Sequence, residues 1–213
     1  LTAKKERRSL VALTAYDYPT ARLLDESGVD LILVGDSLGM VVLGYPDTTT
    51  VTLADMLHHT RAVARGVKNA TVVADLPSGS YDLASTALAN ARQLLEAGAH
   101  AVKLEGGESM APIIAELTAE GIPVLAHIGM LPQHIHEEGG YKIKGRTPQQ
   151  AEQLLADARA VEAAGAFAVV LELVTPPLAR EISQTLAIPT IGIGSGVGCD
   201  GQIRVLHDVI GLY

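Results

Sequence analysis

A short apolar run that recurs along the chain, and ends each time in a polar residue, limits the possible folds most strongly. The run LILV at positions 31–34 has no polar face and leads through Gly35 to Asp36 and Ser37. Such a run suits a strand that is buried on both faces, as the strands of parallel sheets are. The later runs have the following polar ends: Asp75 in VVADLP, Glu105 in AVKLEGG, His127 in VLAHIG and Glu172 in AVVLE. We therefore expect a parallel sheet whose chemistry lies at the carboxyl ends of its strands.

Helical patterns lie between these runs, and glycines end four of them, at Gly28, Gly98, Gly121 and Gly165. A glycine in this position is typical of a left-handed helix C-cap. The patterns predict strands near 10–15, 31–35, 71–75, 101–105, 124–128, 168–172 and 189–193, and an eighth near 205–212. Helices are predicted near 19–27, 53–65, 83–97, 108–120, 148–164 and 176–186.

Seven or eight such units favour an α/β fold, a (β/α)8 TIM barrel that forms one catalytic domain over residues 1–213. A doubly wound open sheet is the alternative. Because the chain stops at Tyr213, where a last helix should cover the eighth strand, we expect a C-terminal helical segment to be missing.

The composition excludes several classes of protein. The 213 residues are 48% hydrophobic and 19% charged, with a net charge of −8, and no basic run continues beyond positions 4–8. This charge argues against nucleic acid as a partner. No apolar stretch reaches the length of a membrane span, and no export signal is recognisable. The single Cys199 cannot form an internal disulfide, which fits a reducing cytoplasm, so we expect a cytoplasmic protein.

One internal repeat places charged residues on a predicted strand. The segments AGAHAVKLE at 97–105 and AGAFAVVLE at 164–172 differ at two positions, so Glu105 and Glu172 end equivalent strands. By strand alternation Lys103 and Glu105 share one face, which we expect to point into the barrel. Buried charges need partners, so these residues indicate either a functional site at the barrel mouth or a buried pair that only stabilises the barrel.

Asp36, Asp75 and Glu105 end three consecutive predicted strands, so their carboxylates are expected to converge. Converging carboxylates repel one another unless a cation or protons neutralise them. Oxygen ligands without cysteine favour Mg²⁺ over zinc, and Mg²⁺ keeps water positions that a substrate can take. The alternative is that each aspartate only caps a helix, since aspartate is a favoured N-cap.

Glu172 has no other acid in its own segment, so it suits the role of a general base. His127 suits a hydrogen bond to the substrate, or the same role as base; a core histidine with satisfied hydrogen bonds is the alternative. The histidines of QHIHEEGGYK lack the spacing of a zinc site, and we expect a solvated loop there that Gly139 and Gly140 make mobile enough to act as a lid. The segment GIGSGVG at 192–198 suits either phosphate binding or a tight turn against ligand or backbone.

Taken together, these segments resemble the ketopantoate hydroxymethyltransferase family. The resemblance is carried by the following motifs: TAYDY (14–18), VGDSLGM (34–40), ADLP (74–77), VKLEGG (102–107), HIG with PQ (127–133), GGYK with GR (139–146), VLE (170–172) and IGIGSG (191–196). They follow the order and spacing of the family over nearly the whole chain. VGDSLGM together with VKLEGG is the most specific part.

The resemblance implies a TIM barrel related to the phosphoenolpyruvate mutase and isocitrate lyase superfamily. It implies transfer of a hydroxymethyl group from 5,10-methylenetetrahydrofolate to 3-methyl-2-oxobutanoate, in pantothenate biosynthesis, with small-molecule partners and a homo-oligomer, commonly a decamer. In this reading Asp36, Asp75 and Glu105 hold Mg²⁺, and Glu172 is the base. The substrate is bound by Asp36, Ser37, Asp75, Lys103 and His127.

Two alternatives from other classes remain open at this point. The first is a Mg²⁺-dependent lyase or mutase of the same superfamily, which acts on a 2-oxo acid without folate. Members of that class commonly carry a cysteine on a lid, whereas Cys199 lies outside the 129–147 loop. The second is a barrel that binds a small acid without turnover.

Overall fold

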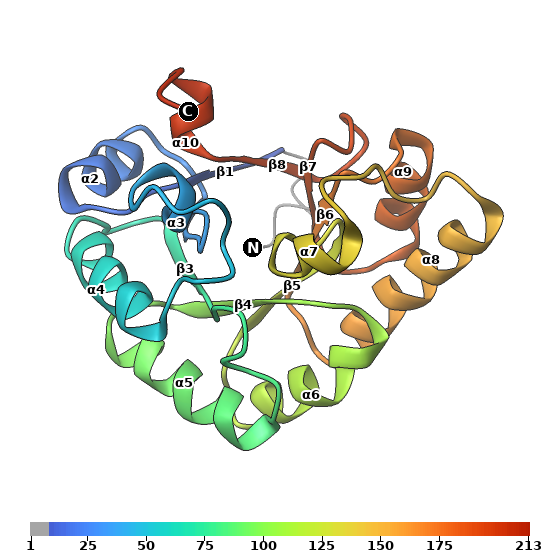
Figure 1. The fold of residues 1–213 in the computed structure, drawn as a ribbon, viewed down its shortest axis with the longest axis horizontal. Coiled ribbons are helices and arrows are strands. Elements are labelled where there is room, and N and C mark those ends of the chain that lie inside the picture. Colours follow the sequence, from blue (N-terminus) through green and yellow to red (C-terminus); the bar gives the residue numbers. More distant parts are fainter. Residues whose placement is uncertain (1–8) are drawn as a thin grey trace. The chain divides into compact units, whose positions relative to one another are not determined.

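The computed structural model of the chain describes residues 9–213, and the basic run at 4–8 lies outside this part. Strands and helices alternate along the chain (Figure 1), and the parallel strands close into a barrel in sequence order. The strands are β1 (Leu10–Thr14), β2 (Leu31–Val34), β3 (Thr71–Asp75), β4 (Ala101–Glu105), β5 (Val124–Gly129), β6 (Ala168–Glu172), β7 (Thr190–Ile193) and β8 (Gly201–Arg204). The predicted (β/α)8 barrel is confirmed, and the open sheet is excluded.

The first seven strands lie where the apolar runs predict them, but the eighth prediction is wrong. Strand β8 ends at Arg204, and Leu206–Val209 form the short helix α10. Its first residue, Gly201, has no room for a side chain, because a Cβ atom there would lie 2.5 Å from the Cβ atom of Leu10. Glycine weakens the apolar pattern by which a strand is recognised. The apolar residues that follow the true strand therefore give a misleading signal.

The longer helices also follow the sequence pattern. They are α2 (Tyr18–Glu26), α4 (Leu53–Ala64), α5 (Ala84–Glu96), α6 (Ala111–Ala119), α8 (Pro148–Ala163) and α9 (Pro176–Thr185). Four of them are followed by the expected left-handed glycines, with φ of +81° at Gly28, +107° at Gly98, +76° at Gly121 and +93° at Gly165. None of the helices in the described part is long and apolar enough to cross a membrane.

Some shorter helical elements are not predicted from the sequence: α3 (Leu38–Val41), α7 (Ile135–Glu138) and the 3₁₀ helix η2 (Pro132–His134). The 3₁₀ helix η1 (Glu108–Met110) lies at the start of the helix predicted near 108–120. The loop predicted over QHIHEEGGYK is thus partly helical, and its helix α7 ends at Gly139 with φ of +65°. Elements of three or four residues bury too little surface to leave a periodic pattern.

Contacts along the chain divide it into two compact units. The first unit comprises Val11–Lys103 and Ile203–Tyr213, and contains most of β1 with β2, β3 and the start of β4. Its strands pair in parallel with Leu33 opposite Val73 and Asp75 opposite Lys103. Helix α4 packs between α2 and α5 and covers β2 and β3, as Figure 1 shows.

The second unit comprises Leu104–Gln202 together with Leu10. Strand β6 pairs in parallel with β5 and β7, with Gly129 opposite Glu172 and Glu172 opposite Ile193. Helices α6, α8 and α9 pack against these strands. The ends of β5, β6 and β7 therefore lie side by side in this unit. The expectation of one catalytic domain over 1–213 stays a prediction.

Candidate active site

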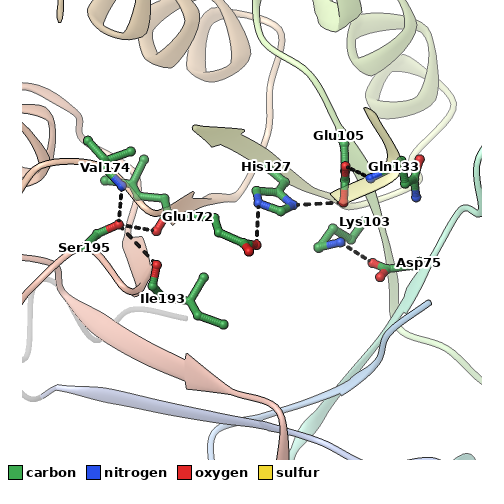
Figure 2. A network of polar contacts seen from close by, with 10 residues as sticks. Asp75, Lys103, Glu105, His127, Gln133, Glu172, Val174, Ile193 and Ser195 are labelled. Carbon is green, nitrogen blue, oxygen red and sulfur yellow. Dashed lines mark hydrogen bonds and ion pairs between the residues drawn. The ribbon is translucent and has the colours of Figure 1, made fainter. Parts of the chain in front are cut away.

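In the first unit a lysine and two aspartates form one buried polar cluster. Lys103 Nζ lies 2.6 Å from Asp75 Oδ1, as Figure 2 shows, and both side chains are at most 5% exposed. The other oxygen of that carboxylate, Oδ2, accepts a hydrogen bond of 3.0 Å from the backbone N–H of Asp36. The pairing of β3 with β4 places Asp75 opposite Lys103, so the register of the strands produces the ion pair. Asp75 thus binds its neighbours directly, and the capping alternative does not describe it.

Gly35 allows the chain to turn sharply between β2 and this cluster. A Cβ atom at this position would lie 2.8 Å from Ser37 Oγ and 3.5 Å from Asp75 Oδ2. The turn brings Ser37, which is half-buried, to within 2.8 Å of the hydroxyl oxygen of Tyr16. Tyr16 is not among the residues predicted from the sequence to bind substrate. Its signals in the sequence are its place two residues after β1 and its membership of the TAYDY motif (14–18).

The surroundings of Tyr16 change the pKa of its hydroxyl group. Burial, opposed by hydrogen bonds from Ser37 and Thr14 and helped by the charges of Asp36 and Asp75, raises the pKa of Tyr16 to about 12. The phenol therefore keeps its proton at neutral pH. Asp36 meets Asp75 through its backbone N–H, and the predicted convergence of their carboxylates stays a prediction.

These residues fit a hard divalent cation by the chemistry of their donors. Two neighbouring carboxylates supply only oxygen, the ligand that Mg²⁺ prefers. Each carboxylate oxygen has two lone pairs, so Asp75 can accept Lys103 and Asp36 N–H and still have capacity for a cation. Over residues 9–213, no group of three or more His, Cys, Asp and Glu side chains is arranged to hold a metal ion. The Mg²⁺ site of Asp36, Asp75 and Glu105 stays a prediction.

In the second unit His127 lies between two carboxylates, as Figure 2 shows. Its Nδ1 atom is 3.3 Å from Glu105 Oε1, and its Nε2 atom is 3.2 Å from Glu172 Oε2. His127 and Glu105 are each 2% exposed, and Glu172 is more open. His127 thus lies between the carboxylates of Glu105 and Glu172 and contacts both.

The backbone around these glutamates is held by hydrogen bonds. Gln133 donates its N–H to Glu105 Oε2 at 3.0 Å, and Met130 donates its N–H to the carbonyl of Glu172 at 2.9 Å. Gly129 makes the second contact possible, because a Cβ atom there would lie 2.3 Å from that carbonyl oxygen. Leu173 has φ of +49°, a left-handed conformation that turns the chain directly after Glu172.

Ser195, in the GIGSGVG segment, binds backbone. Its hydroxyl donates to the carbonyl of Leu171 at 2.7 Å. It also accepts the N–H of Val174 at 2.9 Å, as Figure 2 shows. Ser195 is fully buried and spans the turn at Leu173. Of the two expectations for this segment, the turn packed against backbone describes Ser195. The sequence gives no sign of this role, because the contact joins residues more than 20 positions apart.

The 129–147 loop contains several charged contacts. His134 Nδ1 lies 2.9 Å from Glu137 Oε2 in an exposed pair on η2 and α7. Lys144 forms an ion pair with Glu138, and its backbone N–H donates to the carbonyl of Leu173 at 2.8 Å. The loop is thus joined to the segment that follows Glu172. Its predicted role as a lid stays a prediction.

Solved structures show the class of fold. A phosphonopyruvate hydrolase in complex with oxalate and Mg²⁺ superposes with a TM-score of 0.73 and 18% identity, covering 99% of this chain and 80% of that chain. A 2,3-dimethylmalate lyase, described as a member of the PEP mutase/isocitrate lyase superfamily, gives a TM-score of 0.71 at 21% identity over 99% of this chain. The protein therefore has the (β/α)8 barrel fold of these enzymes.

Sequence relatives identify the family within this fold. The ketopantoate hydroxymethyltransferase family matches residues 1–213. The 3-methyl-2-oxobutanoate hydroxymethyltransferase of Syntrophus aciditrophicus is 56% identical over 212 residues, which are 99% of this chain and 78% of the relative. The enzyme of the same name from Thermus thermophilus is also 56% identical, over 99% of this chain and 80% of the relative. The chain belongs to the ketopantoate hydroxymethyltransferase family.

Proposed function

We propose that this chain transfers a hydroxymethyl group from 5,10-methylenetetrahydrofolate to 3-methyl-2-oxobutanoate, giving 2-dehydropantoate, a precursor of pantothenate. Support comes from relatives of this name that are 52–56% identical over at least 98% of the chain. The observation that carries the proposal is the pairing of Lys103 with Asp75 next to Asp36. An ammonium group and neighbouring carboxylates in a buried cluster suit a 2-oxo acid bound with a divalent cation.

The residues that would hold Mg²⁺ are Asp36 and Asp75, with Glu105 as the third ligand. When bound, the cation supplies a Lewis acid that stabilises negative charge on the keto oxygen of the substrate. Lys103 adds a positive charge for the same oxygen and for the substrate carboxylate. Ser37 Oγ donates a hydrogen bond to the carboxylate. Glu105 lies two positions after Lys103 on β4.

Glu172 takes the proton from C3 of the substrate in this proposal. Loss of this proton leaves an enolate whose C3 atom forms the new carbon–carbon bond with the methylene carbon of the folate. Both bonds from that carbon to the folate nitrogens break, and water supplies the oxygen of the new hydroxyl group. The C3 proton and one proton of that water end on the two nitrogens. His127, 3.2 Å from Glu172 Oε2, holds the base in place and can share the proton that it has taken.

The lyase or mutase alternative has less support. It rests on structures that are 17–21% identical, which show the fold alone. The relatives above 50% identity carry the transferase name. A homo-oligomeric assembly and folate as the one-carbon donor are part of the proposal.

Exchange of the C3 proton tests the role of Glu172 without the folate. The purified protein is mixed with Mg²⁺ and 3-methyl-2-oxobutanoate in D₂O, and the C3 proton signal is followed by NMR. Glu172→Gln is expected to slow the exchange about 10²–10⁴-fold, the contribution of a positioned general base. Glu137→Gln, a change of the same kind on the exposed face of α7, is the matched control and leaves the rate unchanged. Equal exchange by the wild type and Glu172→Gln contradicts the role of Glu172.

A further inference from the structure

The hydroxyl group of Ser37 has a single proton, so its orientation decides whether it attracts or repels an anion. A hydroxyl that points its proton at a carboxylate forms a charge-assisted hydrogen bond, whereas its oxygen alone repels the same group. Ser37 Oγ lies 2.8 Å from Tyr16 Oη, a distance at which either oxygen can be the donor. The direction of this one bond therefore controls the Ser37 proton.

Burial favours Tyr16 as the donor in this pair. Tyr16 is 3% exposed, so its O–H must find an acceptor inside the protein. Ser37 is only half-buried and can donate outward, to ligand or water. If Ser37 donated to Tyr16 instead, the buried phenol proton would need another acceptor.

A third hydroxyl group, that of Thr14, is compatible with the same direction. The backbone N–H of Leu206 donates to Thr14 Oγ1 at 3.0 Å, and an amide N–H can only donate. The Thr14 side chain also hydrogen bonds with the Tyr16 hydroxyl. Thr14 Oγ1 keeps its own proton and a second lone pair, so it can serve Tyr16 Oη as donor or as acceptor. With Thr14 as the donor, the bonds run from Leu206 to Thr14, Tyr16 and Ser37.

Tyr16 is held both through its backbone and through its ring. The carbonyl of Tyr16 accepts a hydrogen bond of 2.7 Å from His59 Nδ1, and its ring packs against the ring of His207 with centroids 5.5 Å apart. Gly35 in turn leaves room for Ser37 Oγ on the side of the turn that faces Tyr16.

We propose that Tyr16 is a positioning residue for substrate binding: its phenol donates to Ser37 Oγ and thereby directs the Ser37 proton at the carboxylate of the 2-oxo acid. Tyr16 itself does not touch the substrate in this arrangement. The inference rests on the proposed function, because it assumes that Ser37 binds a 2-oxo acid.

Tyr16→Phe tests the role of the phenol with little change in packing. Binding of 3-methyl-2-oxobutanoate in the presence of Mg²⁺ is measured by isothermal titration calorimetry, without folate and without turnover. The variant is expected to bind about tenfold more weakly, because an undirected hydroxyl loses part of a hydrogen bond to a charged group. Tyr18→Phe is the matched control: Tyr18 lies two positions further along, is 43% exposed, and its change leaves the affinity unaltered.

A double-mutant cycle with Ser37→Ala separates positioning from general damage to the fold. If Tyr16 acts through Ser37, Tyr16→Phe weakens binding less than twofold when Ser37 is already alanine. A tenfold loss that persists in the Ser37→Ala background overturns the inference, as does equal binding by Tyr16→Phe and the wild type. In both of these cases wild-type binding leaves the proposed function standing. A wild type that binds no 2-oxo acid rejects the proposed function and this inference together.

Discussion

The buried ion pair of Lys103 and Asp75 makes the stability of the protein sensitive to a single substitution. Lys103→Met keeps the length of the side chain and removes its charge, so the Asp75 carboxylate is left with the N–H of Asp36 as its remaining described donor at Oδ2. Removing one partner of a buried pair costs about 3–5 kcal/mol, because the other charge stays buried without compensation. We expect the free energy of unfolding to fall by that amount at neutral pH.

The assay is chemical denaturation in the absence of divalent cations, with an unchanged m value as the sign that only stability has changed. A loss of this size lowers the unfolding temperature by about 6–20 °C for a chain of this length. The matched control is Lys68→Met, an exposed lysine of the same unit, for which we expect a change within about 0.5 kcal/mol.

Two further arms connect this stability to the proposed site. The double variant Asp75→Asn with Lys103→Met removes the stranded charge and is expected to regain most of the lost stability. Mg²⁺ at about 100 times its dissociation constant is expected to return about 2.7 kcal/mol to Lys103→Met, if Asp36 and Asp75 hold the cation. A Lys103→Met protein that is as stable as the Lys68→Met control refutes the reasoning about the ion pair. If Mg²⁺ does not change the free energy of unfolding of Lys103→Met, the role of the aspartates as ligands is refuted.

Two more substitutions give expected outcomes in other parts of the molecule. Gly129→Ala places a Cβ atom 2.3 Å from the carbonyl oxygen of Glu172, so we expect a loss of about 2 kcal/mol or more in denaturation and slower C3 exchange; Gly121→Ala, which meets nothing within 4 Å, should cost only the about 1–2 kcal/mol of its positive φ and leave exchange unaltered. Although burial opposes it, the N–H groups of residues 68–70 lower the pKa of Asp25 below its ordinary value of 3.8, so its stabilising contribution is present above that value and is lost as pH falls through the folded pKa. Asp25→Asn should therefore make the free energy of unfolding less dependent on pH below about 4. If the pH dependence below that value is unchanged, the stabilising role of the Asp25 carboxylate is contradicted.

The sequence predicts the barrel well because the signals for its strands are local. Runs such as LILV and AVVLE have no polar face, and each is preceded by a helix that ends at a glycine. The prediction of the eighth strand is wrong for a long-range reason. Close contact with Leu10, almost 200 positions away, leaves room only for glycine at position 201. A pattern read within one segment cannot contain such a contact.

Some residues of the candidate site can likewise be predicted from local sequence signals, and others cannot. Asp75, Lys103, His127 and Glu172 are recognisable because a charged or polar residue at the end of an apolar strand is unusual. Hydroxyl groups such as that of Ser195 are not, because Ser, Thr and Tyr are common in turns and their partners come from other segments. The structure adds the bonds that hold the predicted residues, and these bonds join residues 20 or more positions apart.

The most direct test of the proposed activity follows the transferred carbon itself. The wild-type protein is incubated with Mg²⁺, 3-methyl-2-oxobutanoate and 5,10-methylenetetrahydrofolate labelled with ¹³C at the methylene carbon. The account predicts a new ¹³C hydroxymethyl signal on 2-dehydropantoate, formed in step with tetrahydrofolate. Absence of that signal from protein that binds Mg²⁺ and the 2-oxo acid, or cleavage of a carbon–carbon bond without use of the folate, would contradict it.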